Sequence, residues 1–371
     1  MYSKEWLVSQ FELSRGGVGH NVRSMEGLRG FAVFLVFMVH YATLVTPWIS
    51  GPLLALSAAA HTMGNAGVDL FFVLSGYLIY GSLISRRQAF TRFMSRRIRR
   101  IYPAFMAVFL VYICLSLVFH SENKIPSHFP AAAIYLLQNF LLLPGLFPIE
   151  PLITVSWSLS YEMFYYLAIP LVIGLFGLRV RSMKWRAVFF SLITISTASY
   201  CAFHGGHIRL IMFVSGILLH EAIASEKISP PGSRMALLAM IFGLMSTTLP
   251  IPGSAGYVLK ILILFISFFM LCFTCFGHPT AWVAKAFCWS PLRWLGNMSY
   301  SYYLIHGLAL KGGFMVFSRF HHSAEFAPLI FWGLLPAMFA LTLIPSAALF
   351  LLVERPFSLA PALNAPKIPR N

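Results

Sequence analysis

The sequence predicts an all-α fold, a polytopic membrane helix bundle of about ten transmembrane helices with both termini in the cytoplasm. Of the 371 residues, 58% are hydrophobic and only 10% are charged, whereas soluble domains carry about 25% charged residues. The mean hydropathy is +0.77, and the apolar residues are gathered into long runs that a lipid bilayer can solvate. So few charges would leave a water-soluble fold without a polar surface.

Ten apolar runs account for most of the chain. A transmembrane helix needs roughly 17–25 apolar residues to cross the hydrocarbon core, and most of these runs reach that length. They lie at residues 30–48, 66–84, 103–119, 157–177, 187–203, 209–224, 235–251, 257–277, 299–318 and 328–352. We therefore expect a cytoplasmic N-terminal segment at 1–27, a transmembrane domain at 28–355 and a Pro-rich cytoplasmic tail at 356–371.

An eleventh apolar run, residues 131–143, is shorter than the others. If the N-terminus is cytoplasmic and this run does not cross, 22 of the 27 lysines and arginines fall on inner segments, as the positive-inside rule requires. If the run crossed, every later loop would change sides and this bias would largely vanish. We therefore predict a periplasmic, re-entrant or interfacial helix here, in a multi-pass protein of a bacterial inner membrane.

The net charge of +16 does not indicate a nucleic-acid partner. The basic residues cluster between apolar runs, where they can meet membrane lipids or an anionic substrate. The five cysteines lie mostly within apolar runs and are expected to be small packing residues. We therefore expect no metal site.

Arg29 and His40 stand on the first predicted span. Eleven residues separate them, close to three helical turns, so both side chains share one helix face about 16 Å apart along the axis. Arg29 is then at the inner interface and His40 near the middle of the membrane. An ionisable residue at that depth indicates a functional site, and a neutral imidazole can accept the proton of an attacking hydroxyl. The alternative is a structural histidine bonded to another helix, with Arg29 as an interfacial anchor.

The cytoplasmic segment before the third span holds seven arginines and no lysine, among them Arg96, Arg97 and Arg100. Arginine forms bidentate contacts to phosphate that lysine does not, and coenzyme A carries a 3′-phosphate and a pyrophosphate. A plain topology signal explains the segment equally well, so both interpretations stay open.

Two carboxylates lie near the outer ends of predicted spans. Asp69 falls in the first turn of its span, where it would favour the helix N-terminus. Glu162 lies about one turn inside its span, and Trp157, Tyr161 and Tyr165 make that end aromatic. Aromatic side chains can line a sugar site, but they also form ordinary interfacial belts. The sequence leaves site and belt open.

Two further features lie near the C-terminal end. His306 is expected about a third of the way across from the inner face, as a hydrogen-bonded core histidine. Glu354 and Arg355 are expected to form a charge pair at the interface.

Taken in order, these segments resemble the acyltransferase 3 family of membrane acyltransferases. The matching segments are Arg29 and His40 as R-X10-H, GVDLFFVLSGYLI at 67–79, RRIRRIYP at 96–103, SWSLSYEMFYY at 156–166, LGNMSYSYYLIH at 295–306 and VERP at 353–356. One such string is weak evidence, but six in the family order are strong, and they extend over essentially the whole membrane part.

The resemblance implies an O-acyltransferase with ten core spans and no permanently bound cofactor. Acyl-CoA, most often acetyl-CoA, would be the co-substrate from the cytoplasm, and the acceptor would be a hydroxyl on a cell-surface glycan or a lipid-linked sugar. It makes Arg29 and His40 essential and assigns donor contact to Arg97 and Arg100, with Arg96 beside them and Arg29 helping to hold the donor. It carries Glu162 and Asp69 over as further catalytic candidates.

Some members of the family continue into a periplasmic esterase domain. We expect this chain to complete the transfer alone or with a separate partner, and glycan-assembly proteins are candidate partners.

A protein of another class remains open at this point. A polysaccharide or small-solute transporter could use His40, Glu162 and His306 as a proton relay. Such transporters often show internal repeats, and we find none in the sequence.

Overall fold

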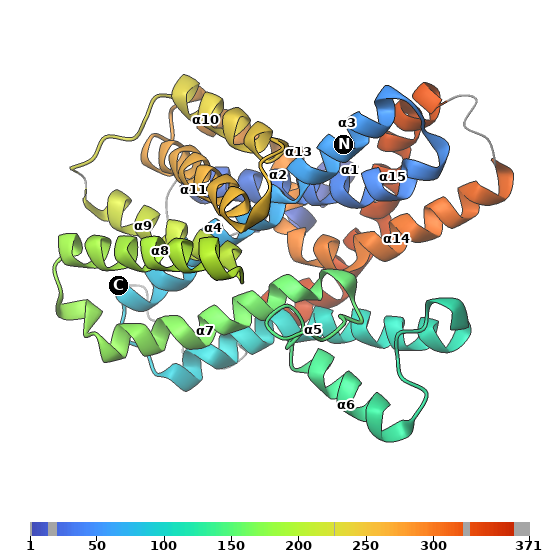
Figure 1. The fold of residues 1–371 in the computed structure, drawn as a ribbon, viewed down its shortest axis with the longest axis horizontal. Coiled ribbons are helices and arrows are strands. Elements are labelled where there is room, and N and C mark those ends of the chain that lie inside the picture. The colour runs from blue at the N-terminus through green and yellow to red at the C-terminus, as the bar shows by residue number, and fades with distance from the viewer. Residues whose placement is uncertain (1, 14–20, 226, 322–326, 360–371) are drawn as a thin grey trace.

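A computed structural model describes residues 2–13, 21–225, 227–321 and 327–359, and within these ranges the chain forms helices and no strands (Figure 1). The helices are α1 (Tyr2–Phe11), α2 (Asn21–Val45), α3 (Pro52–Gly64), α4 (Ala66–Ile84), α5 (Phe90–Val118), α6 (Phe129–Phe140), α7 (Trp157–Leu175), α8 (Met183–His204), α9 (Ile211–Ser225), α10 (Ser233–Ser246), α11 (Gly253–Gly277), α12 (Trp282–Phe287), α13 (Ser290–Asn297), α14 (Ser299–Phe320), α15 (Ala327–Leu349) and the π-helical segment η6 (Phe350–Leu359).

Each of the ten predicted spans coincides with a helix, namely α2, α4, α5, α7, α8, α9, α10, α11, α14 and α15. In the described parts of the chain, eight helical stretches are long and apolar enough to cross a membrane. Of the remaining two, α10 has only 14 residues, and α14 is more polar, with Lys311 and Arg319. The chain is a polytopic membrane helix bundle, as predicted.

Two shorter helices accompany the spans. Helix α6 has 12 residues and is therefore about 18 Å long, less than the roughly 30 Å of the hydrocarbon core. It coincides with the run that was predicted not to cross. Helix α3 has no counterpart among the predicted spans; it packs along α2, where the Ser57 hydroxyl donates to the Ala42 carbonyl at 2.9 Å.

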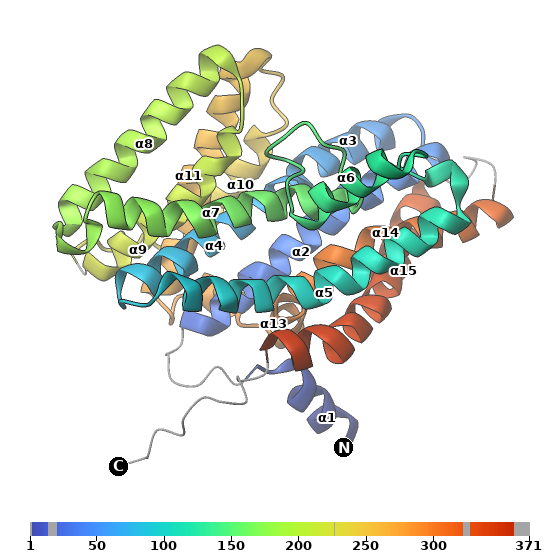
Figure 2. The same cartoon turned by 90° about the horizontal axis from the view of Figure 1, so that it is seen from below.

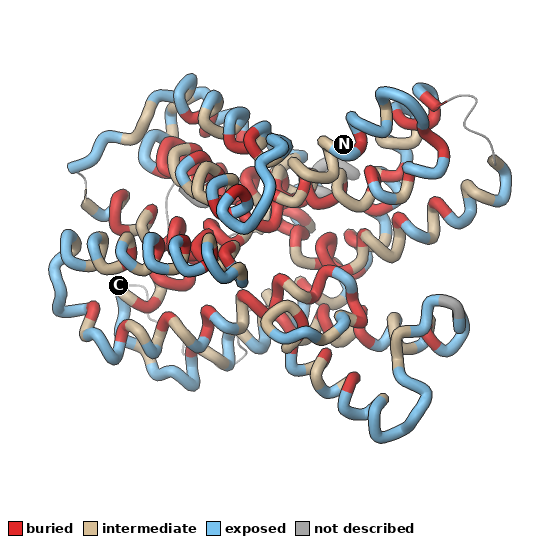
Figure 3. The backbone as a smooth tube through the Cα atoms, in the orientation of Figure 1, coloured by how far each residue is buried: buried red, intermediate tan, exposed pale blue. Residues whose placement is uncertain are grey.

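Helix α2 is the centre of the bundle and packs against α3, α4, α13 and α14. Its backbone approaches α13 closely because Gly30 and Gly296 face each other's helix: a Cβ on Gly296 would collide with the Glu26 carbonyl oxygen, and one on Gly30 with the Leu292 carbonyl oxygen. In Figure 3, buried residues gather around these central helices, while α6, α8 and α10 turn exposed faces outward.

The two described ends of the chain meet at one side of the bundle (Figure 2). The Phe11 ring of α1 stacks on Phe350 of η6 with ring centres 5.6 Å apart. Arg355 donates to the Ser9 carbonyl oxygen at 2.9 Å. That this side faces the cytoplasm remains a prediction, and most of the predicted C-terminal tail, residues 360–371, lies outside the described residues.

Candidate active site

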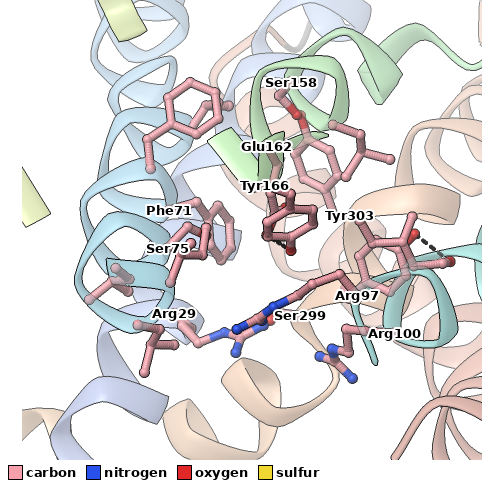
Figure 4. Close-up of a pocket in the computed structure, with 18 residues that line it drawn as sticks. Arg29, Phe71, Ser75, Arg97, Arg100, Ser158, Glu162, Tyr166, Ser299 and Tyr303 are labelled. Atoms are coloured by element: carbon pink, nitrogen blue, oxygen red, sulfur yellow. Dashed lines mark hydrogen bonds between the residues drawn. The ribbon is translucent and has the colours of Figure 1, made fainter. Parts of the chain in front are cut away.

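A cavity of about 130 Å³ lies between α2, α4, α5, α7 and α14; we call it the arginine cavity (Figure 4). Its lining includes four residues that the sequence marked as candidates. They come from three helices and are Arg29, Arg97, Arg100 and Glu162. In Figure 4 the three arginine side chains gather at one end of the cavity, and Ser158 lies at the opposite end. The fold thus joins motifs that are more than 60 residues apart in the chain.

Arg29 and Arg97 enter the cavity from different helices. The Arg29 Nε donates to the Ser299 hydroxyl at 3.2 Å, at the first turn of α14. The Arg97 guanidinium carbon lies 5.3 Å from the ring centres of both Phe93 and Tyr166. Such cation–π contacts hold the face of a guanidinium and do not use its N–H donors. Arg97 is therefore held in place by contacts that are compatible with binding an anion.

Glu162 faces the arginines from α7. The Tyr166 hydroxyl, one turn further along the same helix, donates to Glu162 Oε1 at 2.5 Å. Since Tyr166 also lies under the Arg97 guanidinium, Glu162, Tyr166 and Arg97 form one connected group in the wall of the cavity. Tyr166 therefore belongs to the wall of the cavity, whereas Trp157, Tyr161 and Tyr165 do not line it.

Arg100 is paired with a carboxylate from the C-terminal end of the described chain. Its Nη1 lies 2.7 Å from Glu354 Oε1, and the fully buried Glu354 also accepts from the Ser301 amide at 3.0 Å and hydroxyl at 2.5 Å. The predicted pair of Glu354 with Arg355 is therefore wrong. A buried carboxylate requires a partner, and Arg100 from α5 meets that need while Arg355 turns to α1.

Asp69 and Arg96 do not line the arginine cavity. Asp69 is buried at the start of α4 and accepts two hydrogen bonds from Arg209, both at 2.8 Å. The Arg209 guanidinium also lies 5.2 Å from the Trp157 ring centre. Arg96 is exposed and donates to Gln88. The geometry gives Asp69 a structural partner and leaves Arg96 at the surface.

Sequence patterns did not mark Arg209 as a partner for Asp69. The one signal for it is a basic residue at the outer end of a predicted span, against the positive-inside rule. A partner 140 positions away in the chain explains that exception.

His40 lines a second, larger cavity of about 540 Å³, which we call the histidine cavity. Its walls come from α2, α5 and α14 and from the segments that follow α5 and precede α7. Residues along its walls include Thr43, Tyr112, Glu122, Gly307 and Lys311. The ring of His306 lies beside His40, with ring centres 5.0 Å apart and planes at 65°. His40 therefore faces a cavity, but not the one that the arginines line.

One turn of α14 separates the two cavities. Tyr303 lines the arginine cavity and Gly307 lines the histidine cavity, and four residues correspond to roughly 6 Å along a helix. The Tyr303 hydroxyl lies 2.7 Å from the Ser158 hydroxyl and donates to the Val155 carbonyl at 3.1 Å. This hydrogen-bonded pair lies in the wall of the arginine cavity, one turn of α14 from Gly307, and we call it the partition.

An integral membrane protein with arginines in one cavity and an imidazole in the next is equipped to hold an anionic molecule and to move protons beside it. Comparison with known proteins places it in a family. The family model described as an acyltransferase domain, acyltransferase 3, matches residues 22–351. The chain belongs to this acyltransferase family, as its motifs indicated.

Curated relatives cover the same region. The chain is 29% identical over 313 residues to the O-acetyltransferase OatA of Staphylococcus aureus, a match that covers 76% of this chain and 49% of that protein. It is 27% identical over 320 residues to the peptidoglycan O-acetyltransferase OatA of Listeria monocytogenes, with 77% and 49% covered. The chain thus spans about half the length of these relatives. No solved structure matches it.

Proposed function

We propose that this protein is a membrane O-acetyltransferase of the bacterial inner membrane. It transfers an acetyl group from acetyl-CoA, bound from the cytoplasm, to a hydroxyl of a cell-surface or lipid-linked glycan. The observation that carries this proposal is the arrangement of the two cavities: Arg29, Arg97 and Arg100 line one, and His40 lines the other, one helical turn beyond its end.

The arginine cavity suits the phosphates of coenzyme A. Guanidinium groups bind phosphate oxygens with paired, charge-assisted hydrogen bonds. Arg97 is steadied by two aromatic faces and Arg100 by Glu354, so both guanidinium groups lose little conformational freedom when an anion binds. The pantetheine arm would then extend toward Ser158 and Tyr303 at the other end of the cavity.

The acyl transfer would take place where the thioester meets His40. One nitrogen of the neutral His40 ring takes the proton of the acceptor hydroxyl, and the hydroxyl oxygen attacks the thioester carbon. The carbon–sulfur bond breaks, and coenzyme A leaves as a thiol with the proton that His40 had accepted. In a competing route, the His40 nitrogen itself attacks and forms an acyl-histidine, which the acceptor then cleaves.

The histidine cavity suits the acceptor. It is large enough for a sugar ring, and it reaches exposed residues beyond the end of α5, where Glu122 pairs with Lys311 at 2.5 Å. Glycan-assembly proteins that deliver the acceptor are the partners expected at this side.

A gene deletion tests the proposed function without knowledge of the acceptor. Base-labile acetyl groups on surface glycans would be measured by mass spectrometry in the deletion strain and after complementation. We expect the deletion to remove one class of acetyl ester, the wild-type gene to restore it and the His40→Ala gene to fail. Full restoration by His40→Ala, at equal protein level in the membrane, would contradict the proposal.

A further inference from the structure

His306 is a buried ionisable residue that the mechanism above does not use. Its side chain is fully buried, and its ring lies beside His40 at 5.0 Å between centres. An imidazole placed next to a catalytic imidazole can decide which nitrogen of that ring carries a proton.

The surroundings of His306 fix its own protonation pattern. Its Nδ1 lies 2.9 Å from the Tyr302 carbonyl oxygen and 3.0 Å from the Tyr303 carbonyl oxygen. Carbonyl oxygens only accept hydrogen bonds, so Nδ1 carries a proton. In a neutral ring, Nε2 then presents a lone pair. This Nε2 is buried and has no hydrogen-bond partner among the described residues.

The His306 ring is also held in place from two helices. The Tyr302 ring stacks on it at 5.1 Å with planes 13° apart. The Tyr302 hydroxyl lies 2.8 Å from the Thr342 hydroxyl of α15. The lone pair of His306 therefore has a fixed position, whereas His40 is only partly buried.

No carboxylate among the described residues that line the histidine cavity is available to accept the N–H of His40 in place of His306. The one carboxylate among its described lining residues, Glu122, is paired with Lys311 at 2.5 Å, and both side chains are more than half exposed. The other charged lining residue, Lys124, is paired with Glu150 at 3.1 Å.

We propose that His306 is a positioning residue for His40. Its Nε2 accepts the N–H of His40, which leaves the opposite His40 nitrogen unprotonated and directed at the acceptor hydroxyl. A hydrogen bond of about 3 Å between two imidazole nitrogens, each about 1 Å from its ring centre, gives centres about 5 Å apart. The observed separation of 5.0 Å between the ring centres permits this bond when the His40 N–H is turned toward Nε2.

The chain of hydrogen bonds would run from the backbone carbonyls of Tyr302 and Tyr303 through His306 and His40 to the acceptor. It has the logic of a serine-hydrolase triad, in which a third group orients the base, but here the third group is neutral. When His40 takes up the acceptor proton, its second N–H stays bonded to His306, which stabilises the imidazolium that forms.

This inference rests on the proposed function. Two substitutions of His306 distinguish the role of its Nε2 acceptor from the bond that its Nδ1 makes to the backbone. In His306→Asn, the side-chain amide can still donate to the Tyr302 carbonyl, but nothing replaces Nε2. In His306→Gln, the longer side chain can place its carbonyl oxygen near the Nε2 position.

Inverted membrane vesicles from the producing strain would supply the native acceptor, and labelled acetyl-CoA would be the probe. We expect His306→Asn to lower kcat about 100-fold with KM for acetyl-CoA unchanged. His306→Gln should recover at least about tenfold of that loss. Equal loss in both His306 variants, or wild-type kcat in His306→Asn, would overturn the inference.

A measurement on the wild-type protein keeps the inference testable if the variants do not fold. Nitrogen-15 NMR of histidine-labelled protein distinguishes the two neutral tautomers. We expect His306 to be protonated at Nδ1 and not at Nε2; protonation at Nε2 would overturn the inference. Activity in His40→Ala would instead contradict the proposed function, so the two failures are distinguishable.

Discussion

The arginine cavity and the histidine cavity differ in size, charge and the way their polar groups are held. The first measures about 130 Å³ and has three guanidinium groups in its wall, whereas the second measures about 540 Å³ and is lined by one imidazole, that of His40, together with Glu122, Lys124 and Lys311. A fixed positive charge beside a general base opposes protonation of that base. Under the proposed function, adjacent cavities would let one protein bind an anionic donor strongly and still keep a working base.

The largest effect that this comparison predicts is a loss of turnover, while the affinity for the donor stays the same. His40→Ala should lower kcat by about 10²–10⁴-fold, because general-base catalysis contributes that range. The affinity for coenzyme A, measured on purified protein in detergent, should stay within about twofold of wild type. A parallel loss of coenzyme A affinity would show that the histidine cavity binds the donor.

The complementary change should affect donor binding first. Arg97→Ala should raise KM for acetyl-CoA about 10–100-fold, since it removes charge-assisted hydrogen bonds worth about 1.5–3 kcal/mol. Arg92→Ala, an exposed arginine on the same helix, is the matched control and should leave KM unchanged. If both variants behaved alike, the arginines would act through overall charge and not as a built site.

A third prediction concerns stability outside both cavities. Asp69→Asn leaves the buried Arg209 without its ion partner, which should lower the free energy of unfolding by about 3–5 kcal/mol. Thermal unfolding in detergent should show this loss, and the double variant Asp69→Asn with Arg209→Met should recover part of it. At temperatures where the single variant is folded, kcat should change little; a large drop in kcat there would make Asp69 catalytic.

The smallest effect is expected at the partition. Tyr303→Phe removes the hydroxyl that contacts Ser158 at 2.7 Å and Val155 at 3.1 Å. Hydrogen bonds of this kind contribute about 0.5–1.5 kcal/mol, so hydrolysis of acetyl-CoA without an acceptor should rise about 2–10-fold. A variant with unchanged hydrolysis would mean that Tyr303 does not separate donor from water.

Much of the fold could be predicted because the bilayer demands long apolar runs. The ten spans and the short helix α6 follow from length, hydropathy and basic residues. Helix α3 could not be predicted, because its short run alternates small and apolar residues without a charge pattern to separate it from α4 (Ala66–Ile84).

The site was predicted in part. The sequence motifs and the predicted membrane depth single out Arg29, Arg97 and Glu162. That they share one cavity depends on how three helices pack, which the sequence does not show. The pairs Arg100–Glu354 and Asp69–Arg209 join residues 254 and 140 positions apart, and no local pattern encodes such a choice of partner. Arg29 and His40 lie on one helix at a spacing of about three turns, yet they line different cavities.

The most direct test is an electron cryomicroscopy structure with a non-hydrolysable acetyl-CoA analogue. We expect its phosphates to contact Arg97 and Arg100, its pantetheine arm to pass between Tyr303 and Ser158, and its acyl group to end beside His40. An analogue whose phosphates lay in the histidine cavity, or whose acyl group stayed on the arginine side of an unbroken partition, would contradict the proposed division of the site.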